Sequence, residues 1–310
     1  MHDLKTVLTS LRVPVVAAPM FLLSQPETVI ACCQAGVIGS MPALNLRTSE
    51  ALDEALTAIS AGIPAGAPYA INLIVHPSNP RLKADIAIVA KHRVPIVITS
   101  LGAVAEVVDA VHAYGGLVWH DVTTRRHAEK AVAAGVDGIV AVAAGAGGHG
   151  GQLSPFALVS EIRQFFDGTL LLGGAINHGR DLLAAQVMGA DLAYMGTRFI
   201  NTQESAAGDD YKAMVSASSA SDVAYTDQVS GIPGNFLIPS LRAAGVEPRQ
   251  WGGKPVDLGK ELSVPEGGAK AWKSLWSAGQ GVGSISDCPS VAELVERLEQ
   301  EYQAARESIG

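Results

Sequence analysis

The sequence predicts an α/β protein: a (β/α)8 barrel that carries a small, mainly helical insertion as a lid. About eight short apolar runs alternate with helical patterns up to about residue 200. The runs are apolar throughout instead of alternating with polar residues, which is typical of parallel strands covered on both faces. Eight such units most simply close into a barrel, whereas an open doubly wound sheet is the alternative.

Each expected strand is short and rich in Val, Ile, Leu and Ala. The strands are Pro14–Ala18, Val37–Met41, Tyr69–Ile74, Pro95–Thr99, Leu117–His120, Gly138–Val142, Thr169–Gly173 and Leu192–Met195. The helical patterns between them are Pro26–Ala35, Ser49–Ala61, Pro80–Lys91, Ala103–Tyr114, Arg125–Ala134, Pro155–Phe166 and Arg180–Met188. Glycines follow several of these patterns, where a left-handed residue commonly ends a helix: Gly36, Gly62, Gly115, Gly135 and Gly189. Ser24 and Glu27 are spaced as a capping box for the first helix.

The repeat is lost over residues 203–270, which are polar and rich in Ser, Ala, Gly and Pro. We therefore expect residues 1–202 and 271–310 to form the barrel and residues 203–270 to form a small domain that caps the substrate pocket. Ser290 and Glu293 predict a capping box for a final amphipathic helix. Its apolar face would consist of Val291, Leu294, Val295 and Leu298.

Composition narrows the possible functions. Hydrophobic residues make up 48% of the chain and charged residues 17%, as in a soluble protein with much buried surface. The net charge of −8 and the absence of a basic block argue against nucleic acid as a partner. No apolar stretch is long enough to cross a membrane and no signal peptide is recognisable, so a cytoplasmic location is expected. A homodimer is a guess from the apolar composition alone.

Neither the cysteines nor the histidines have the spacing of metal ligands, so no metal site is expected. Cys32, Cys33 and Cys288 are expected to fill the core. The histidines outside the strand ends are expected to be solvated: His76, His92, His112, His127 and His178.

Candidate ligand-binding residues follow the expected strands, where (β/α)8 barrels place their active sites. Ala18, Pro19 and Met20 follow the first strand, Asn72 lies in the third, and His120 ends the fifth before Asp121. A glycine-rich run with a single histidine, "AAGAGGHGG", follows the sixth and contains Gly147, Gly148 and His149. Gly173 and Gly174 follow the seventh strand, and Met195, Gly196 and Thr197 follow the eighth.

Glycine-rich loops after the last two strands commonly bind phosphate through backbone N–H groups. The third glycine-rich loop, after the sixth strand, indicates a broad, flat ligand lying against backbone. Flavin mononucleotide (FMN) fits this description, but composition and spacing do not separate it from a sugar phosphate. A sugar-phosphate lyase or isomerase and a pure phosphate-ligand binding protein therefore stay open as non-flavin alternatives.

Six motifs resemble the nitronate monooxygenases, formerly called 2-nitropropane dioxygenases: "VPVVAAPM", "INL", "AGGHGGQLSPFALV", "LGGAINHGRD", "YMGTRF" and "WSAGQGVG". Their superfamily includes the FMN-dependent enoyl-ACP reductases. The resemblance runs over nearly the whole chain and implies an FMN-containing barrel with a small lid. The family's active-site histidine maps onto His149. Its flavin contacts map onto Ala18 to Met20, Asn72, Gly147, Gly148, Gly173, Gly174 and Met195 to Thr197. His120 is a further candidate cofactor contact, although many relatives place a lysine beside it where this chain has Asp121.

The resemblance implies an FMN-dependent oxidation of an alkyl nitronate by O2 to a carbonyl compound and nitrite. The sequence "APM" after the first strand favours this branch over an enoyl-ACP or quinone reductase driven by NAD(P)H. In this interpretation His149 accepts a proton or, when charged, holds the anionic nitronate.

Several other polar and aromatic residues are weaker candidates. Arg198 is expected to face a phosphate or to pair with a carboxylate. Gln152, Gln228 and Gln280 could point into the pocket, and Trp251, Trp272 and Trp276 are expected to pack within the cap.

Overall fold

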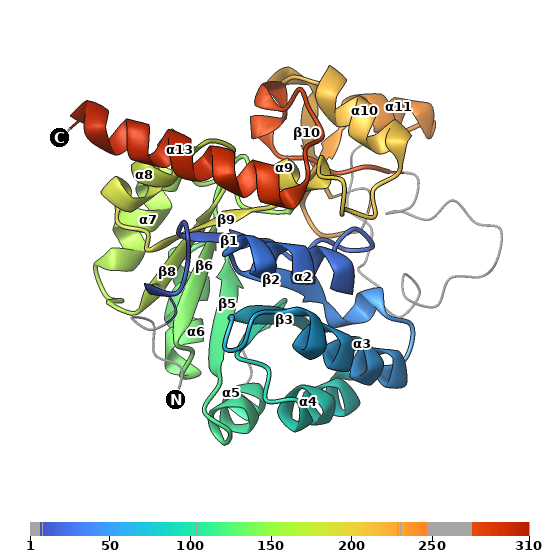
Figure 1. The fold of residues 1–310 in the computed structure, drawn as a ribbon, viewed down its shortest axis with the longest axis vertical. Coiled ribbons are helices and arrows are strands. Elements are labelled where there is room, and N and C mark those ends of the chain that lie inside the picture. Colours follow the sequence, from blue (N-terminus) through green and yellow to red (C-terminus); the bar gives the residue numbers. More distant parts are fainter. Residues whose placement is uncertain are drawn as a thin grey trace.

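The computed structural model describes residues 7, 9–102, 105–227, 229, 231–246 and 275–309. Eight parallel strands lie in the order β1-β9-β8-β6-β5-β4-β3-β2 (Figure 1). The two edge strands of this order meet through a parallel bridge between Val16 and Ile38, so the sheet closes on itself. The predicted (β/α)8 barrel is confirmed and the open sheet is excluded.

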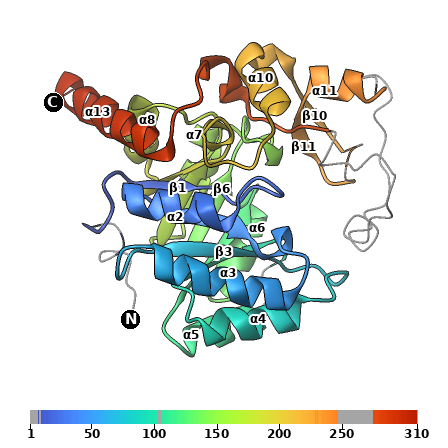
Figure 2. The same cartoon turned by 45° about the vertical axis from the view of Figure 1, so that its right-hand side comes forward.

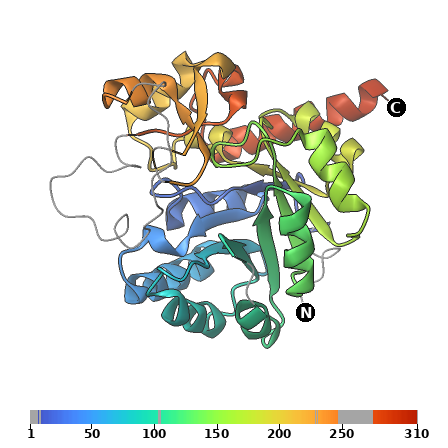
Figure 3. The ribbon, with the colours of Figure 1, turned by 180° about the vertical axis from the view of Figure 1, so that it is seen from behind.

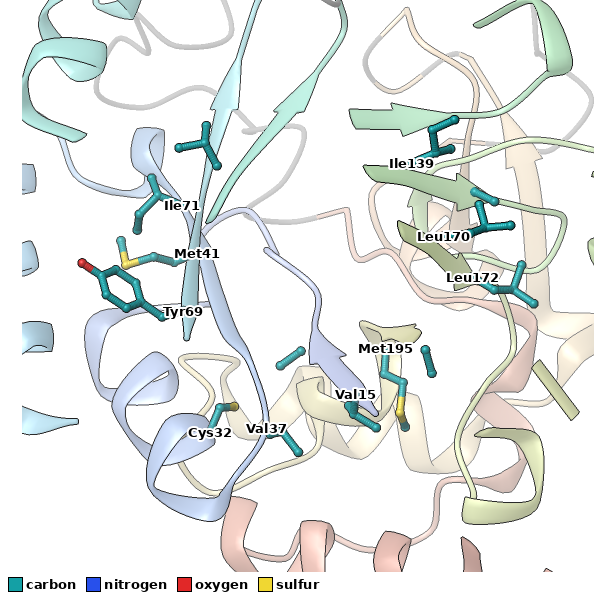
Figure 4. Packing of buried hydrophobic residues seen from close by; sticks show 14 of the residues in the cluster. Val15, Cys32, Val37, Met41, Tyr69, Ile71, Ile139, Leu170, Leu172 and Met195 are labelled. Carbon is teal, nitrogen blue, oxygen red and sulfur yellow. The ribbon is translucent and has the colours of Figure 1, made fainter. Parts of the chain in front are cut away.

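The barrel strands match the expected ones to within two residues at either end. They are β1 (Val15–Ala17), β2 (Gly39–Pro42), β3 (Tyr69–Ile74), β4 (Ile96–Ser100), β5 (Leu117–Val122), β6 (Gly138–Val142), β8 (Thr169–Gly173) and β9 (Leu192–Met195). Both faces are buried, which is why the runs are apolar throughout. Side chains such as Ile98, Trp119 and Leu171 fill the interior of the barrel. The other face packs against the helices in the larger cluster of Figure 4, which includes Ile71 and Leu172.

Helices cover the outside of the barrel (Figures 1 and 3). Those that follow the first seven strands are α2 (Pro26–Ala35), α3 (Ser49–Gly62), α4 (Leu82–Lys91), α5 (Ala105–His112), α6 (Arg125–Ala133), α7 (Pro155–Arg163) and α8 (Gly179–Met188). The C-terminal helix α13 (Val291–Ile309) packs against α8 and α2 and so takes the place of the eighth barrel helix. Its predicted capping box is present, and the predicted apolar face is buried.

The chain between β9 and α13 begins with the short helix α9 (Thr197–Ile200) and forms a cap beside the barrel (Figure 2). The cap contains the expected helices, α10 (Asp209–Ala217) and α11 (Ile238–Ala243), but also two unexpected strands, β10 (Val223–Thr226) and β11 (Gly234–Leu237). These strands pair antiparallel with each other, and β11 also pairs with the two-residue strand β7 (Gly148–His149) of the barrel. The glycine-rich loop after β6 is therefore part of the cap's sheet.

Local signals were misleading at two helix ends. Ser24 does not cap α2, because its hydroxyl accepts a hydrogen bond from the Met20 N–H at 3.0 Å and folds the β1–α2 loop instead. Gly62 does not adopt the left-handed conformation but is the last residue of α3. A Cβ at Gly62 would lie 2.9 Å from Cδ1 of Ile30, so packing of α2 on α3 accounts for this glycine. Gly36, Gly115, Gly135 and Gly189 do have positive φ as expected.

The expectation for the cysteines holds for two of the three. Cys32 and Cys33 are buried, and burial raises the pKa of the Cys33 thiol to about 11. Cys288 is exposed, so it does not fill the core.

Candidate active site

A cavity of about 980 Å³ opens at the carboxyl ends of the barrel strands, beneath the cap. This is the end at which (β/α)8 barrels bind their ligands. Every site residue predicted from the sequence lines this one cavity: Ala18, Pro19, Met20, Asn72, His120, Gly147, Gly148, His149, Gly173, Gly174, Met195, Gly196 and Thr197. The sequence thus located the cavity, because the barrel brings all strand ends to one rim.

The glycines of the cavity wall serve two different purposes. A Cβ at Gly147 would lie 2.8 Å from the backbone nitrogen of Gly279, and one at Gly174 would lie 2.8 Å from the carbonyl oxygen of Ala144. Close packing between loops therefore requires these two glycines, whatever the ligand. At Gly196 a Cβ would meet only Ala18 and Met20, both beyond 3.6 Å, so a side chain there would extend into open cavity. Gly148 has similar space, but its φ of 69° favours glycine in any case.

The loop that carries His149 is held in place by residues far along the chain. The N–H of Gly148 donates to Oγ of Ser277, and Ser277 Oγ in turn donates to the carbonyl of Asn235 at 2.7 Å. The Asn235 side chain donates to the carbonyl of Ala146 at 2.6 Å. Together with the pairing of His149 and Gly234, these hydrogen bonds provide partners for backbone N–H and C=O groups in the irregular loop around the histidine. The loop is therefore a fixed platform despite its glycines.

His149 lies in the wall of the cavity, and desolvation lowers the pKa of its imidazole to about 4. The ring is consequently neutral at neutral pH and can act as a base. Of the two roles expected from the sequence, the neutral one is favoured before substrate enters. An anionic substrate beside the ring would raise this pKa, because a nearby negative charge favours the protonated form.

The floor of the cavity carries a chain of hydrogen bonds that the sequence did not reveal. The Asn72 amide donates to Ser100 Oγ at 2.7 Å, and the Ser100 hydroxyl donates to Oδ2 of Asp121. The other carboxylate oxygen, Oδ1, is buried and has no hydrogen-bond partner among the described residues. Burial raises the pKa of Asp121 to about 6, and the Ser100 hydrogen bond acts in the opposite direction. Tyr194 also lines the cavity, and burial, with the nearby Asp121, raises the pKa of its phenol.

His120 lines the same cavity but is 5% exposed and points to the side of β5 that packs against the helices, like Val118 and Val122. Its Nδ1 lies 2.7 Å from the Thr99 hydroxyl, which is also 3.3 Å from the carbonyl oxygen of Trp119. Desolvation lowers the pKa of His120 to about 4, so the ring is neutral at neutral pH.

The cap contributes cavity residues that the sequence alone did not identify. Tyr211, Tyr225 and Ser277 all line the wall. Tyr211 donates to the carbonyl of Ser277, and Tyr225 donates to the carbonyl of Gly150 at 3.0 Å. The only available signal was the motif "WSAGQGVG", which contains Ser277 but does not show that it reaches the loop of His149.

The weaker candidates have mixed outcomes. Arg198 pairs with Asp287 at 2.7 Å, which was one of its two expected roles. Neither Gln152 nor Gln280 lines the cavity, and Trp276 packs in the cap by stacking on Tyr211. Gln228, Trp251 and Trp272 lie outside the described residues. Two histidines differ from expectation: His92 is largely buried against Asp53, and His127 lines the cavity.

Within the described ranges, no three His, Cys, Asp or Glu side chains are grouped as metal ligands. No described helix is long and apolar enough to cross a membrane.

The sequence comparisons with known proteins include both a family profile and full-length relatives of one family, the nitronate monooxygenases. The sequence profile of the nitronate monooxygenase family matches residues 79–301. A nitronate monooxygenase from Paraburkholderia phytofirmans is 27% identical over 96% of this chain and 94% of its own length. An octahydroindene-carboxyl-CoA dehydrogenase from Rhodococcus jostii is 28% identical over 78% of this chain and 68% of its own length. The structure of a nitroalkane oxidase from Streptomyces ansochromogenes superimposes with a TM-score of 0.82 at 24% identity, covering 97% of this chain and 99% of that one. This last likeness concerns the fold.

Proposed function

Because the chain belongs to the nitronate monooxygenase family and is an oxidoreductase by that membership, we propose that it oxidises alkyl nitronates with FMN and O2. The products would be a carbonyl compound and nitrite. One observation carries the proposal: the residues onto which the family's flavin contacts and active-site histidine map line a single cavity at the catalytic end of the barrel.

The cavity fits FMN in three respects. Its wall includes the glycine-rich loops after β6, β8 and β9, and a Cβ at Gly196 would enter the space where a flat ring can approach the backbone. The loops after β8 and β9 are the usual phosphate-binding pair of such barrels. Most of the remaining lining is apolar, for instance Met20, Leu44 and Ile176, as a flavin ring requires. The proposed contacts are those predicted from the sequence, with Gly174 and Thr197 near the phosphate.

FMN, when bound, would supply the one-electron chemistry that links the nitronate to O2. The protein's contribution is to bind and orient. The apolar wall excludes water, and the neutral His149 offers a ring nitrogen to the substrate. An anionic nitronate placed against His149 would favour a protonated imidazole, which then pairs with the substrate's charge. The cap would close over the substrate through Tyr211 and Tyr225.

The test is anaerobic mixing of the purified protein with two kinds of reductant. The protein is expected to be yellow, to keep its flavin through a desalting column and to release FMN instead of FAD. Ethylnitronate or propionate 3-nitronate should bleach the flavin, whereas NADH and NADPH should not. Rapid bleaching by NAD(P)H with inert nitronates would favour the enoyl-ACP or quinone reductase instead. A colourless protein that FMN cannot reconstitute would leave the sugar-phosphate enzyme or binding protein.

A further inference from the structure

Asp121 lies at the floor of the cavity, and only one of its two carboxylate oxygens has a hydrogen-bond partner among the described residues. Its Oδ2 accepts a hydrogen bond from the Ser100 hydroxyl, and Ser100 Oγ in turn accepts one from the Asn72 amide. Its Oδ1 is buried and has no partner in the described part of the chain. A buried carboxylate oxygen without a donor is costly, so the missing donor is expected from whatever fills the cavity.

The direction of the missing bond decides what the ligand must offer. An ionised Asp121 needs an N–H or O–H donor at Oδ1, whereas a protonated Asp121 would donate to a carbonyl. We propose that Oδ1 of ionised Asp121 accepts a hydrogen bond from a ring N–H of the bound flavin, so that flavin binding is coupled to loss of the Asp121 proton to solvent. This inference rests on the proposed function, because oxidised isoalloxazine supplies that N–H as an imide.

Asp121 is expected to be the group whose change of charge near pH 6 affects flavin binding. On the neighbouring strands β4 and β6, its neighbours are Ser100 and Val140, neither of which ionises. The other ionisable groups that share its strand or line the cavity in the described part of the chain are Tyr194, Tyr211, Tyr225, His120, His149, His127 and Lys130. Burial raises the pKa of the phenols of Tyr211 and Tyr225, so both are uncharged near pH 6. Burial raises the pKa of Tyr194 and lowers those of His120 and His149 to about 4, so all three are uncharged near pH 6. His127 and Lys130 belong to α6 on the outer side of β5, and the pKa of Asp121 follows burial and the Ser100 bond alone.

The coupling has a definite sign. If only the ionised form binds the ring, affinity is full above pH 6 and falls as pH drops below it. Between pH 7.5 and pH 5 the dissociation constant of the flavin should rise about tenfold, since about a tenth of Asp121 remains ionised at pH 5. A protonated Asp121 that donates to a flavin carbonyl would produce the opposite trend.

The experiment measures flavin affinity by fluorescence quenching in the full-length chain freed of flavin, from pH 5 to pH 8. Riboflavin is the main probe, because the phosphate of FMN itself titrates near pH 6. FMN is measured in parallel. The wild type should lose about tenfold in affinity toward pH 5, and Asp121→Asn should give a flat profile. Asp53→Asn, which changes a carboxylate paired with Lys91 away from the cavity, should retain the wild-type profile.

Ser100→Ala provides a second test that leaves the carboxylate in place. The Ser100 hydroxyl stabilises the ionised form of Asp121, so its removal should raise the pKa of Asp121. The midpoint of the flavin-affinity profile should then move to higher pH. The inference would be overturned, and the proposed function left standing, if the flavin affinity of the wild type did not change with pH or fell as pH rose. It would also be overturned if Asp121→Asn and Ser100→Ala both kept the wild-type pH profile. A wild type that binds neither FMN nor riboflavin at any pH would refute the proposed function together with it.

Discussion

Replacing Asp121 by asparagine should stabilise the flavin-free protein at neutral pH, although it changes a half-buried polar residue at the candidate site. Burial raises the pKa of this carboxyl from an ordinary 3.8 to about 6. The native state therefore holds the Asp121 proton more tightly than the unfolded state does, and stability falls as pH rises from about 4 to about 6. Above that window the full penalty for a buried negative charge remains. Asparagine does not ionise and avoids this penalty, while its amide oxygen can still accept from Ser100.

The magnitude follows from the pKa change. A rise from 3.8 to about 6 corresponds to about 3 kcal/mol of native-state destabilisation at pH values above both. Because Asp121 is only half-buried, solvent screens part of its charge. We therefore expect Asp121→Asn to gain about 1–3 kcal/mol at pH 7.5 and almost nothing at pH 4. Urea denaturation of the flavin-free chain at the two pH values measures this difference.

Asp53→Asn is the matched control, because its carboxylate lies outside the cavity and its pKa is lowered by hydrogen bonds from Lys91 and His92. For that residue the sign reverses: the stabilising contribution is present above the ordinary pKa and is lost as pH falls. Loss of stability in Asp121→Asn at pH 7.5, or a gain of equal size at pH 4, would refute the account of Asp121 as a buried acid with a raised pKa.

Three further predictions concern catalysis and packing. His149→Asn should keep the fold and the flavin but lower turnover with nitronate by about 10²–10⁴-fold, as steady-state kinetics would show; loss of flavin instead would make His149 a cofactor residue. Ser277→Ala should lower turnover while flavin binding persists, because the Gly148 N–H and the Asn235 carbonyl both lose a partner; unchanged kinetics would show that the loop of His149 holds itself in place. Gly179→Ala should destabilise the protein by at least about 1–3 kcal/mol in urea, because a Cβ there would lie 2.1 Å from the Tyr302 nitrogen and force α8 away from α13; a neutral result would mean that the two helices separate easily.

The barrel could be predicted from the sequence because its signal is repeated and local. Each strand is an apolar run such as Gly138–Val142, and each lies between helical patterns of ordinary length. The positions of His149 and Asn72 in the cavity followed from the rule that strand carboxyl ends meet at one rim. One error arose because a residue's partner lies far away in the sequence. Gly62 is predicted to end a helix in the left-handed conformation, but the structure requires a glycine there because Ile30 of another helix packs against it.

The chemistry of the floor was hidden for the same reason. Whether Asp121 faces the cavity or the helices depends on the strand's alternation and on the register of β5 against β4, which places Thr99 opposite His120. Ser100 is one residue further along and reaches the next side chain, Asp121. No local pattern in "TSL" or "WHDV" contains this contact. Its consequence, an acid with a raised pKa and one unsatisfied oxygen, exists only once the strands are paired.

The candidate site has two parts that are positioned by different elements of the fold: the floor by the barrel strands, and His149 by the cap. The strand ends supply the floor, including Asn72 and Asp121, and these positions are fixed by the register of the barrel. His149, by contrast, belongs to β7 and is paired with Gly234 of the cap, while Ser277 ties its loop to the chain that leads into α13. Since α13 completes the helical layer of the barrel, the cap is connected to the barrel on both sides, through α9 and through α13. A change in the cap is therefore expected to move the imidazole relative to the floor without altering the floor itself. Under the proposed function, variation in the cap would change which substrate reaches His149, while the floor proposed to bind the flavin ring stays constant.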